Sequence, residues 1–196
     1  MNVMDQLRPK LDSLRKVALP AGVLGLIVCG IGAVVDPTQF FRSWLFAFLF
    51  WLAPTLGSLA WLMVHHVVGG GWGFVIRRPL EAATRVLPLM LVFFVPLLFG
   101  MNALYPWANP ENVRGDEVLE SKALYLNVPG FIIRAAIYFA IWIGLAYYFN
   151  KKSREQDETG DAMITHRATL MAPPGLILYV LTMTFAAVDW VMSMNP

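Results

Sequence analysis

Charged residues are scarce in this sequence, and cysteine is almost absent. Asp, Glu, Lys and Arg make up 14% of the residues, whereas 58% are hydrophobic. With a mean hydropathy of +0.59, this composition excludes an ordinary soluble domain and indicates a chain surrounded by lipid. Cys29 is the single cysteine, so an internal disulfide is excluded. The sequence also lacks a C-x-x-C-H motif for covalent haem and a cysteine set for an iron–sulfur cluster.

Long apolar runs dominate what is present. A helix needs about 20 mostly apolar residues to cross a bilayer. Five such runs lie at residues 17–35, 43–66, 86–104, 128–149 and 174–194. The sequence therefore predicts an all-α fold, a polytopic transmembrane helix bundle with five spans in this chain.

The residues before the first run are polar and mixed in charge, and Pro9 interrupts them. We expect residues 1–16 to form a cytoplasmic interfacial arm and residues 17–196 to form the transmembrane domain. So long a polar segment, with no convincing cleavage site after it, argues against a secretory signal peptide. The first span is therefore expected to be retained.

Basic residues are distributed unequally between the two sides of the predicted bundle. Of the fifteen Lys and Arg, eleven precede the first span or lie between spans two and three or spans four and five. Three lie on the opposite side, and Arg134 falls within a span. Because cytoplasmic loops are enriched in Lys and Arg, the N-terminus is predicted to be cytoplasmic.

The loop between spans two and three, HHVVGGGWGFVIRRPLEAATR, is unusually polar for a membrane edge. For His65 and His66 three interpretations stay open. A histidine pair at a helix C-terminus interacts favourably with the exposed carbonyls without any further function. Histidine also titrates near neutrality, so the pair is a candidate proton entry point. Metal or haem ligation is the weakest alternative, because adjacent helical positions point about 100° apart and no further ligand set is visible.

The same loop is expected to open the third helical segment. Pro79 suits the first position of a helix. Glu81 and Arg85 have the i, i+4 spacing of an ion pair on that helix. The alternative interpretation is that they form only an exposed surface pair with no further role. Arg77, Arg78 and Arg85 are predicted to be topology anchors that also hold anionic lipid or an acidic partner surface.

Two charged residues fall inside the predicted spans. Arg134 lies about 9 Å into a helix that begins near Val128, and Asp189 lies about 7 Å from the end of the fifth span. Both are on the outer side. Because an unpaired charge in hydrocarbon is costly, we expect Arg134 to pair with Asp189. The pair is interpreted either as structural or as the outer end of a proton or ion route.

Proline and small residues add further expectations. Pro88 and Pro96 predict an irregular third span that faces other helices. The segment NKKSREQDETGD is expected to be a charged cytoplasmic loop, with Pro173 and Pro174 starting the last helix. Small residues recur every four positions in the first span, which predicts close approach of another helix; they are Ala21, Gly25, Cys29 and Ala33.

Several strings together resemble a known family. They are HH with GGWGFVIRRPLEAATR, YLNVP followed by RAAIYFAIW, SREQD with TGD, and PPGLILYVLTMTFAAVDWVMSMNP. From about Arg42 to the end, the chain looks like the amino-terminal half of a membrane subunit of alternative complex III, the bacterial quinol:cytochrome c oxidoreductase. The membrane subunits of that complex are related to the polysulfide-reductase, or NrfD-like, membrane subunits. Since the chain stops as the fifth span exits, we expect a larger protein to continue beyond it.

The resemblance implies a bundle of about ten spans in the bacterial inner membrane, beside an NrfD-like sister subunit. It also implies multi-haem cytochrome c and iron–sulfur partners that carry the haem and clusters, so no cofactor and no metal is expected in this chain. Quinol is expected, if anywhere, at the interface with the sister subunit. Membrane lipids are further partners, and no nucleic-acid partner is expected.

The resulting hypothesis is a membrane subunit that supports quinol-linked electron transfer, with proton translocation as an added role and no catalytic residue of its own. His65, His66 and Glu81 would serve the cytoplasmic end of a proton pathway, and Arg134 and Asp189 the outer end. Two alternatives stay open. Half of a secondary transporter would show inverted internal symmetry, which is not visible here. A structural membrane anchor would need only the packing surfaces and loops.

Overall fold

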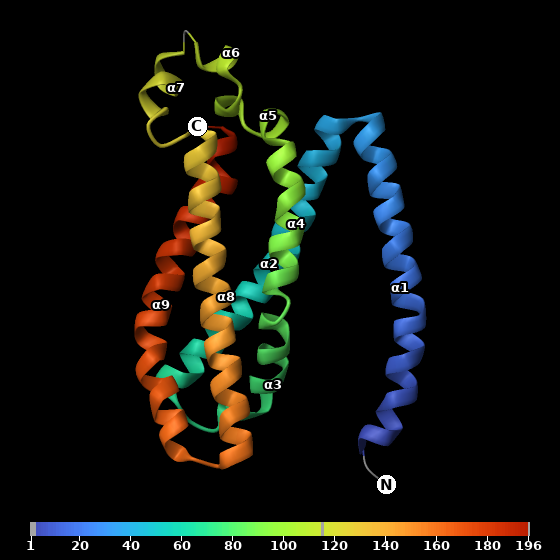
Figure 1. Cartoon of the computed structure of the whole chain (residues 1–196), viewed down its shortest axis with the longest axis vertical. Coiled ribbons are helices and arrows are strands. Elements are labelled where there is room, and N and C mark those ends of the chain that lie inside the picture. Colours follow the sequence, from blue (N-terminus) through green and yellow to red (C-terminus); the bar gives the residue numbers. More distant parts are fainter. Residues whose placement is uncertain (1–2, 115, 196) are drawn as a thin grey trace.

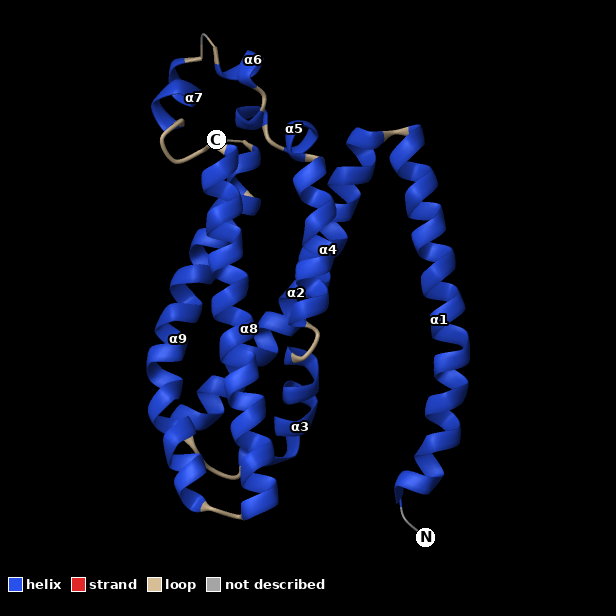
Figure 2. Ribbon diagram, viewed as in Figure 1, coloured by secondary structure: helices blue, strands red, loops and turns tan. Residues whose placement is uncertain are grey.

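The described part of the chain, residues 3–114 and 116–195 of a computed structural model, is helical wherever it has regular structure (Figure 2). Five helical segments are long and apolar enough to cross a membrane, which confirms the predicted all-α architecture with five candidate spans. These segments are 12–35, 37–68, 75–99, 128–159 and 162–194. The chain thus has the composition and architecture of a polytopic membrane protein.

The long helices run up and down, and short helices form a cap at one end (Figure 1). The elements are α1 (Val3–Val35), α2 (Pro37–Val68), α3 (Trp72–Thr84), α4 (Leu87–Phe99), α5 (Met101–Leu104), η1 (Pro106–Ala108), α6 (Pro110–Val113), α7 (Glu117–Lys122), α8 (Val128–Thr159), α9 (Ala162–Trp190) and η2 (Met192–Met194). Helix α2 packs against α3, α4 and α9, while α8 packs against α9 and α4. The core lies among α2, α4, α8 and α9.

Helix α1 stands apart from this bundle and meets α2 mainly near the turn that joins them (Figure 1). Cys29 is exposed, and a Cβ added at Gly25 would meet nothing within 4 Å. Within the described part of this chain, no helix therefore covers the small-residue stripe. Helix α1 is continuous from Val3, so residues 3–16 belong to the same helix as the first span, and Met1 and Asn2 lie outside the described residues. The interfacial position of this arm stays a prediction.

Three long helices begin at side chains that cap free backbone N–H groups. Asp36 accepts from the backbone of Gln39 at the start of α2, Asn127 accepts from Gly130 in α8, and Asp161 accepts from Met163 in α9. Such caps satisfy donors that the first turn of a helix leaves without partners. The start of α8 at Val128 agrees with the predicted span.

Two expected boundaries near the turn between α8 and α9 are wrong. The segment expected to be a charged loop is helical, because α8 continues to Thr159 and ends at Gly160, whose φ of +66° suits a left-handed helix cap. Its charges support a helix: Lys152 and Glu155 pair at 2.6 Å in an i, i+3 arrangement. Because the Asp161 cap starts α9 earlier, Pro173 and Pro174 lie inside that helix, and both are exposed.

The segment between spans two and three also differs from expectation. It is a helix–turn–helix in which Gly69 and Gly70, with φ of +69° and +86°, reverse the chain. Helix α3 therefore begins at Trp72 and contains Pro79, which does not start a helix as predicted. The third span is irregular as expected, since it breaks between α3 and α4, and α4 packs against α2 and α8.

Helix α9 lies close to α2 and α8 at Gly175. A Cβ at this position would lie 3.1 Å from both Leu145 Cδ2 and Met63 Sδ. Gly175→Leu is therefore expected to lower the free energy of unfolding by about 2 kcal/mol through overpacking. Gly57→Leu is the matched control, because a Cβ at Gly57 meets nothing within 4 Å. Unfolding in mixed micelles measures both, and equal stabilities would contradict this packing.

Candidate functional site

A buried ion pair joins α8 and α9 near the end of the bundle that the short helices cap (Figure 1). This end, which the basic residues predict to face outward, is called the outer end below, and the opposite end is called the inner end. Arg134 donates from Nε to Asp189 Oδ2 at 2.9 Å and from NH2 to Asp189 Oδ1 at 3.0 Å. The side chain of Asp189 is 1% exposed and that of Arg134 is 20% exposed. Two parallel bonds between a guanidinium and a carboxylate give a charge-assisted contact with fixed geometry. The predicted pairing is confirmed.

Tyrosines complete this outer cluster. The Tyr138 hydroxyl donates to Asp189 Oδ2 at 2.7 Å, and Arg134 NH1 donates to the Tyr125 carbonyl at 3.0 Å. The guanidinium carbon of Arg134 also lies 4.0 Å from the centre of the Tyr125 ring, a cation–π contact. Burial, and secondly the Asp189 carboxylate, raises the pKa of the Tyr125 hydroxyl above its usual value. Tyr125 and Tyr138 were not predicted, although Tyr138 follows Arg134 at helical i, i+4 spacing.

The segment between α4 and α8 folds over the end of α9. The Tyr105 hydroxyl donates to the Trp190 carbonyl at 3.1 Å, and Trp107 Nε1 donates to the Ser193 carbonyl at 3.1 Å. These bonds satisfy carbonyls that the end of a helix leaves without partners. Burial, with a smaller effect from Asp189, raises the pKa of Tyr105 and keeps its hydroxyl a donor. Tyr105 and Trp107, which are 2% and 4% exposed, are therefore part of the packed structure.

The inner end of the bundle holds a second buried carboxylate, Glu81. It accepts from Arg77 Nε at 2.8 Å and from Arg78 NH1 at 2.9 Å, and its side chain is 2% exposed. The predicted Glu81–Arg85 pair is wrong, and so is the alternative of an exposed pair. Helical side chains lean toward the N-terminus of the helix, so Glu81 reaches back to residues three and four positions earlier.

Helix α8 supplies the rest of the inner cluster. Arg78 also donates to Ser153 at 3.1 Å and binds Asp157, which ties α3 to α8. Arg85 donates from Nε to Asn150 Oδ1 at 3.0 Å, and Asn150 Nδ2 donates to Thr84 Oγ1 at 2.8 Å. None of these α8 partners was predicted, because the segment that carries most of them was expected to be a loop. The roles of Arg77, Arg78 and Arg85 as topology or lipid anchors stay predictions.

The histidine pair lies beside the inner cluster without joining it. His66 is 9% exposed and stacks on Phe149 with ring centres 5.3 Å apart. His65 packs edge-on against Trp72 at 5.5 Å, and its buried Nδ1 has no hydrogen-bond partner among the described residues. The ring rests on Gly73, where a Cβ would overlap it. Over the described ranges, no group of three or more His, Cys, Asp or Glu residues is placed to hold a metal ion.

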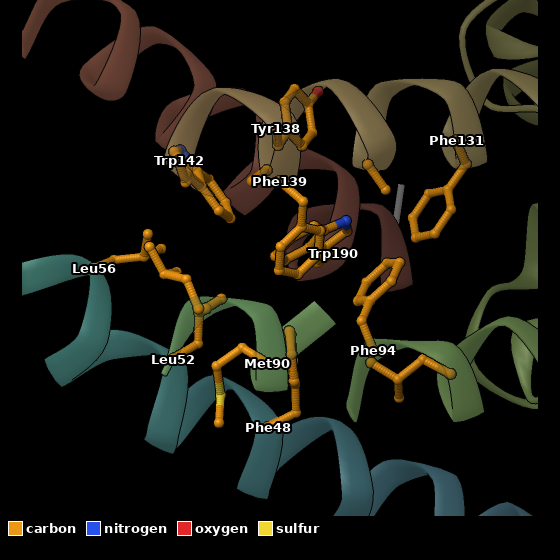
Figure 3. Close-up of a cluster of buried hydrophobic side chains, with 14 of the residues drawn as sticks. Phe48, Leu52, Leu56, Met90, Phe94, Phe131, Tyr138, Phe139, Trp142 and Trp190 are labelled. Atoms are coloured by element: carbon orange, nitrogen blue, oxygen red, sulfur yellow. The ribbon is translucent and has the colours of Figure 1, made fainter. Parts of the chain in front are cut away.

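Buried apolar side chains, many of them aromatic, pack together between α2, α4, α8 and α9 (Figure 3). Along α8, this apolar layer lies between the two clusters. Twelve positions of α8 separate Tyr138 from Asn150, a rise of about 18 Å. The buried residues of α8 in this interval are Phe139, Trp142, Leu145, Ala146 and Phe149. Trp190 of α9 lies against this layer, with its ring centre 5.8 Å from that of Phe139. Thr182 provides polar contacts within it: Trp142 Nε1 donates to Thr182 Oγ1 at 2.9 Å, and Thr182 Oγ1 donates to the Leu178 carbonyl at 2.7 Å.

The predicted site residues thus fall into separate groups. Arg134 and Asp189 meet at the outer end, Glu81 meets Arg77 and Arg78 at the inner end, and Arg85 belongs to the adjoining Asn150 network. Among the described residues, no continuous chain of hydrogen bonds joins the two ends. Comparison with protein-family models and with curated proteins gives no match for this chain. The geometry alone characterises a polytopic membrane protein with polar clusters at both ends.

The outer ion pair is tested by a double-mutant cycle. Asp189→Asn and Arg134→Gln are each expected to lower the free energy of unfolding by about 3 kcal/mol, because each leaves a buried partner unpaired. The double variant should recover about 2 kcal/mol relative to the sum of the single losses. Arg42→Gln, an exposed arginine on the same side, is the control. Strictly additive losses would contradict a direct coupling.

The inner carboxylates allow a matched comparison. Glu81→Gln is expected to lower the free energy of unfolding by about 2 kcal/mol, since a buried carboxylate with two charge-assisted partners is removed. Glu155→Gln removes a carboxylate that is 33% exposed and pairs with lysines, so its effect on the free energy of unfolding should be much smaller than that of Glu81→Gln. The measurement is reversible unfolding of both variants in the same micelles. Equal losses would show that burial does not distinguish the two pairs.

Proposed function

We propose that this chain is an integral membrane subunit of a quinol:cytochrome c oxidoreductase of the alternative complex III type. In that role it supports quinol-linked electron transfer between partner subunits that carry the haem and iron–sulfur groups. The observation that carries the proposal is the pair of buried charged clusters, one at each end of a bundle of apolar helices. The sequence strings that resemble a membrane subunit of that complex supply the family, and several of them contain residues of these clusters.

The positions of the clusters support a role at both membrane surfaces. Arg134 and Asp189 have similar depths on α8 and α9, while Glu81 joins α3 to α8 through Arg78. Charged groups inside membrane proteins are rare and are usually retained for ion or proton routes. Proton translocation is therefore the added role that we assign to Glu81 and Asp189, with His65 and His66 beside the inner cluster.

The apolar layer between the clusters limits how this chain takes part in such a route. Protons move along hydrogen-bonded groups or water, and about 18 Å of mainly apolar packing separates Tyr138 from Asn150 along α8. A route from one face to the other therefore needs groups from a neighbouring subunit or from further helices. The same layer favours a second candidate function, that of a structural membrane anchor in which both clusters only hold helices together.

Purification of an affinity-tagged chain from native membranes tests the proposal. The wild-type chain is expected to bring with it a multi-haem cytochrome c, an iron–sulfur subunit and quinol oxidation activity. In the same preparation, Asp189→Asn should assemble and reduce turnover and proton uptake by about a hundredfold, the lower end of the typical contribution of a positioned proton-transfer group.

The outcomes separate the candidates. A chain that purifies alone, with no haem protein, would contradict the oxidoreductase assignment. An intact complex with unchanged turnover and proton uptake in Asp189→Asn would remove Asp189 from any pathway and favour the structural anchor. Arg42→Gln, outside both clusters, controls for a general effect of charge removal on the outer side.

A further inference from the structure

A groove runs along the surface between α4 and α8. It consists of two adjoining cavities of about 220 Å³ and 470 Å³ that share Ile143 and Tyr147 in their walls. The smaller cavity lies at the inner end, where Arg85, Asn150 and Arg154 surround it. The larger continues toward the outer side and is lined by apolar residues and Tyr147. The groove thus has a polar mouth and an apolar body.

Small residues of α8 form the floor of the apolar body. Ala136, Ala140 and Gly144 line it at four-residue spacing, and a Cβ at Gly144 would meet nothing within 4 Å. From Asn150 to Ala140, α8 rises about 15 Å, half of the hydrocarbon thickness of a bilayer. The groove therefore has the length of an acyl chain in one leaflet.

Charge at the mouth distinguishes this groove from the rest of the inner end. Arg77 and Arg78 are neutralised by Glu81 and Asp157. In contrast, within the described ranges no carboxylate forms an ion pair with Arg85 or Arg154. Arg85 uses its Nε to bind Asn150, and no described residue accepts from its two terminal nitrogens. Two guanidinium groups without counter-ions therefore line one cavity.

We propose that this groove binds an anionic phospholipid of the cytoplasmic leaflet. The phosphate lies between Arg85 and Arg154, which are unneutralised arginines suited to phosphate oxygens. One acyl chain follows Tyr147, Ile143 and Gly144 into the apolar body. The charge of the mouth favours this occupant over a neutral quinone, whose head group needs no cations, and over an apolar helix of another subunit. The site is independent of the proposed oxidoreductase role.

Lipid binding to the delipidated chain tests the charged mouth. Native mass spectrometry in detergent is expected to show tighter binding of phosphatidylglycerol than of phosphatidylcholine. Arg85→Gln and Arg154→Gln should each weaken phosphatidylglycerol binding about fivefold, as expected for one basic group near an anionic lipid. The double variant should weaken it about 25-fold. Arg167→Gln removes an exposed arginine at the same end, outside the groove, and should leave binding unchanged.

Filling the apolar body provides a test that leaves every charge in place. Gly144→Leu places a side chain in open space within the groove, so the fold should be retained while binding of phosphatidylglycerol falls at least fivefold. Gly57→Leu, on α2, is the control and should bind as the wild-type chain does. Equal affinities for the two lipids, or wild-type binding by the double arginine variant, would overturn the proposal. So would a purified complex in which a quinone or a partner helix fills the groove.

Discussion

The cost of leaving a charge unpaired in hydrocarbon determines much of this structure. Asp189 is 1% exposed, and it is surrounded by two N–H groups of Arg134 and the hydroxyl of Tyr138. These contacts hold α8 and α9 in a single register at their outer ends. At the inner end Glu81 does the same for α3 and α8, because Arg78 binds both Glu81 and Asp157. Ion pairs thus join α8 to α9 at one end and to α3 at the other, and apolar packing holds the helices together between the ends.

The packing between the ends is dominated by aromatic rings. Trp190 contacts rings from α2, α4 and α8, including Phe48, Phe94 and Phe139 at centre distances of 5.8, 4.8 and 5.8 Å (Figure 3). Such contacts stabilise a membrane protein by close packing, since the hydrophobic effect does not favour helix over lipid. Because this layer is mainly apolar, each polar cluster has its own environment. A substitution in one cluster is therefore expected to change the hydrogen bonds and ion pairs of that end and to leave those of the other end in place.

Much of this architecture was predictable from composition and helix periodicity. The five candidate spans and the start of α8 at Val128 follow from apolar length and from the Asn127 cap. The Arg134–Asp189 pair was predictable because no other charges lie so deep in the apolar runs, and both have similar depths. The partners of Glu81 were missed because spacing alone does not show which way a side chain leans.

Tertiary packing explains the other missed features. The charged end of α8 looks like a loop by composition, yet ion pairs and the Asp161 cap of the following helix make it a helical hairpin. The apolar layer depends on which faces of α2, α4, α8 and α9 meet, and one sequence does not specify that. The Asn150–Thr84 contact joins residues 66 positions apart and has no local signal.

The length of α8 has a consequence for how the two ends respond to their surroundings. Its 32 residues extend about 48 Å, well beyond the roughly 30 Å of a hydrocarbon core. The Arg78–Asp157 pair therefore lies at the aqueous edge, where dissolved ions screen charges over about 8 Å at physiological ionic strength. The Arg134–Asp189 pair is shielded from them. Salt is consequently expected to weaken the exposed Arg78–Asp157 pair more than the buried Arg134–Asp189 pair, so ionic strength acts mainly on one end of this protein.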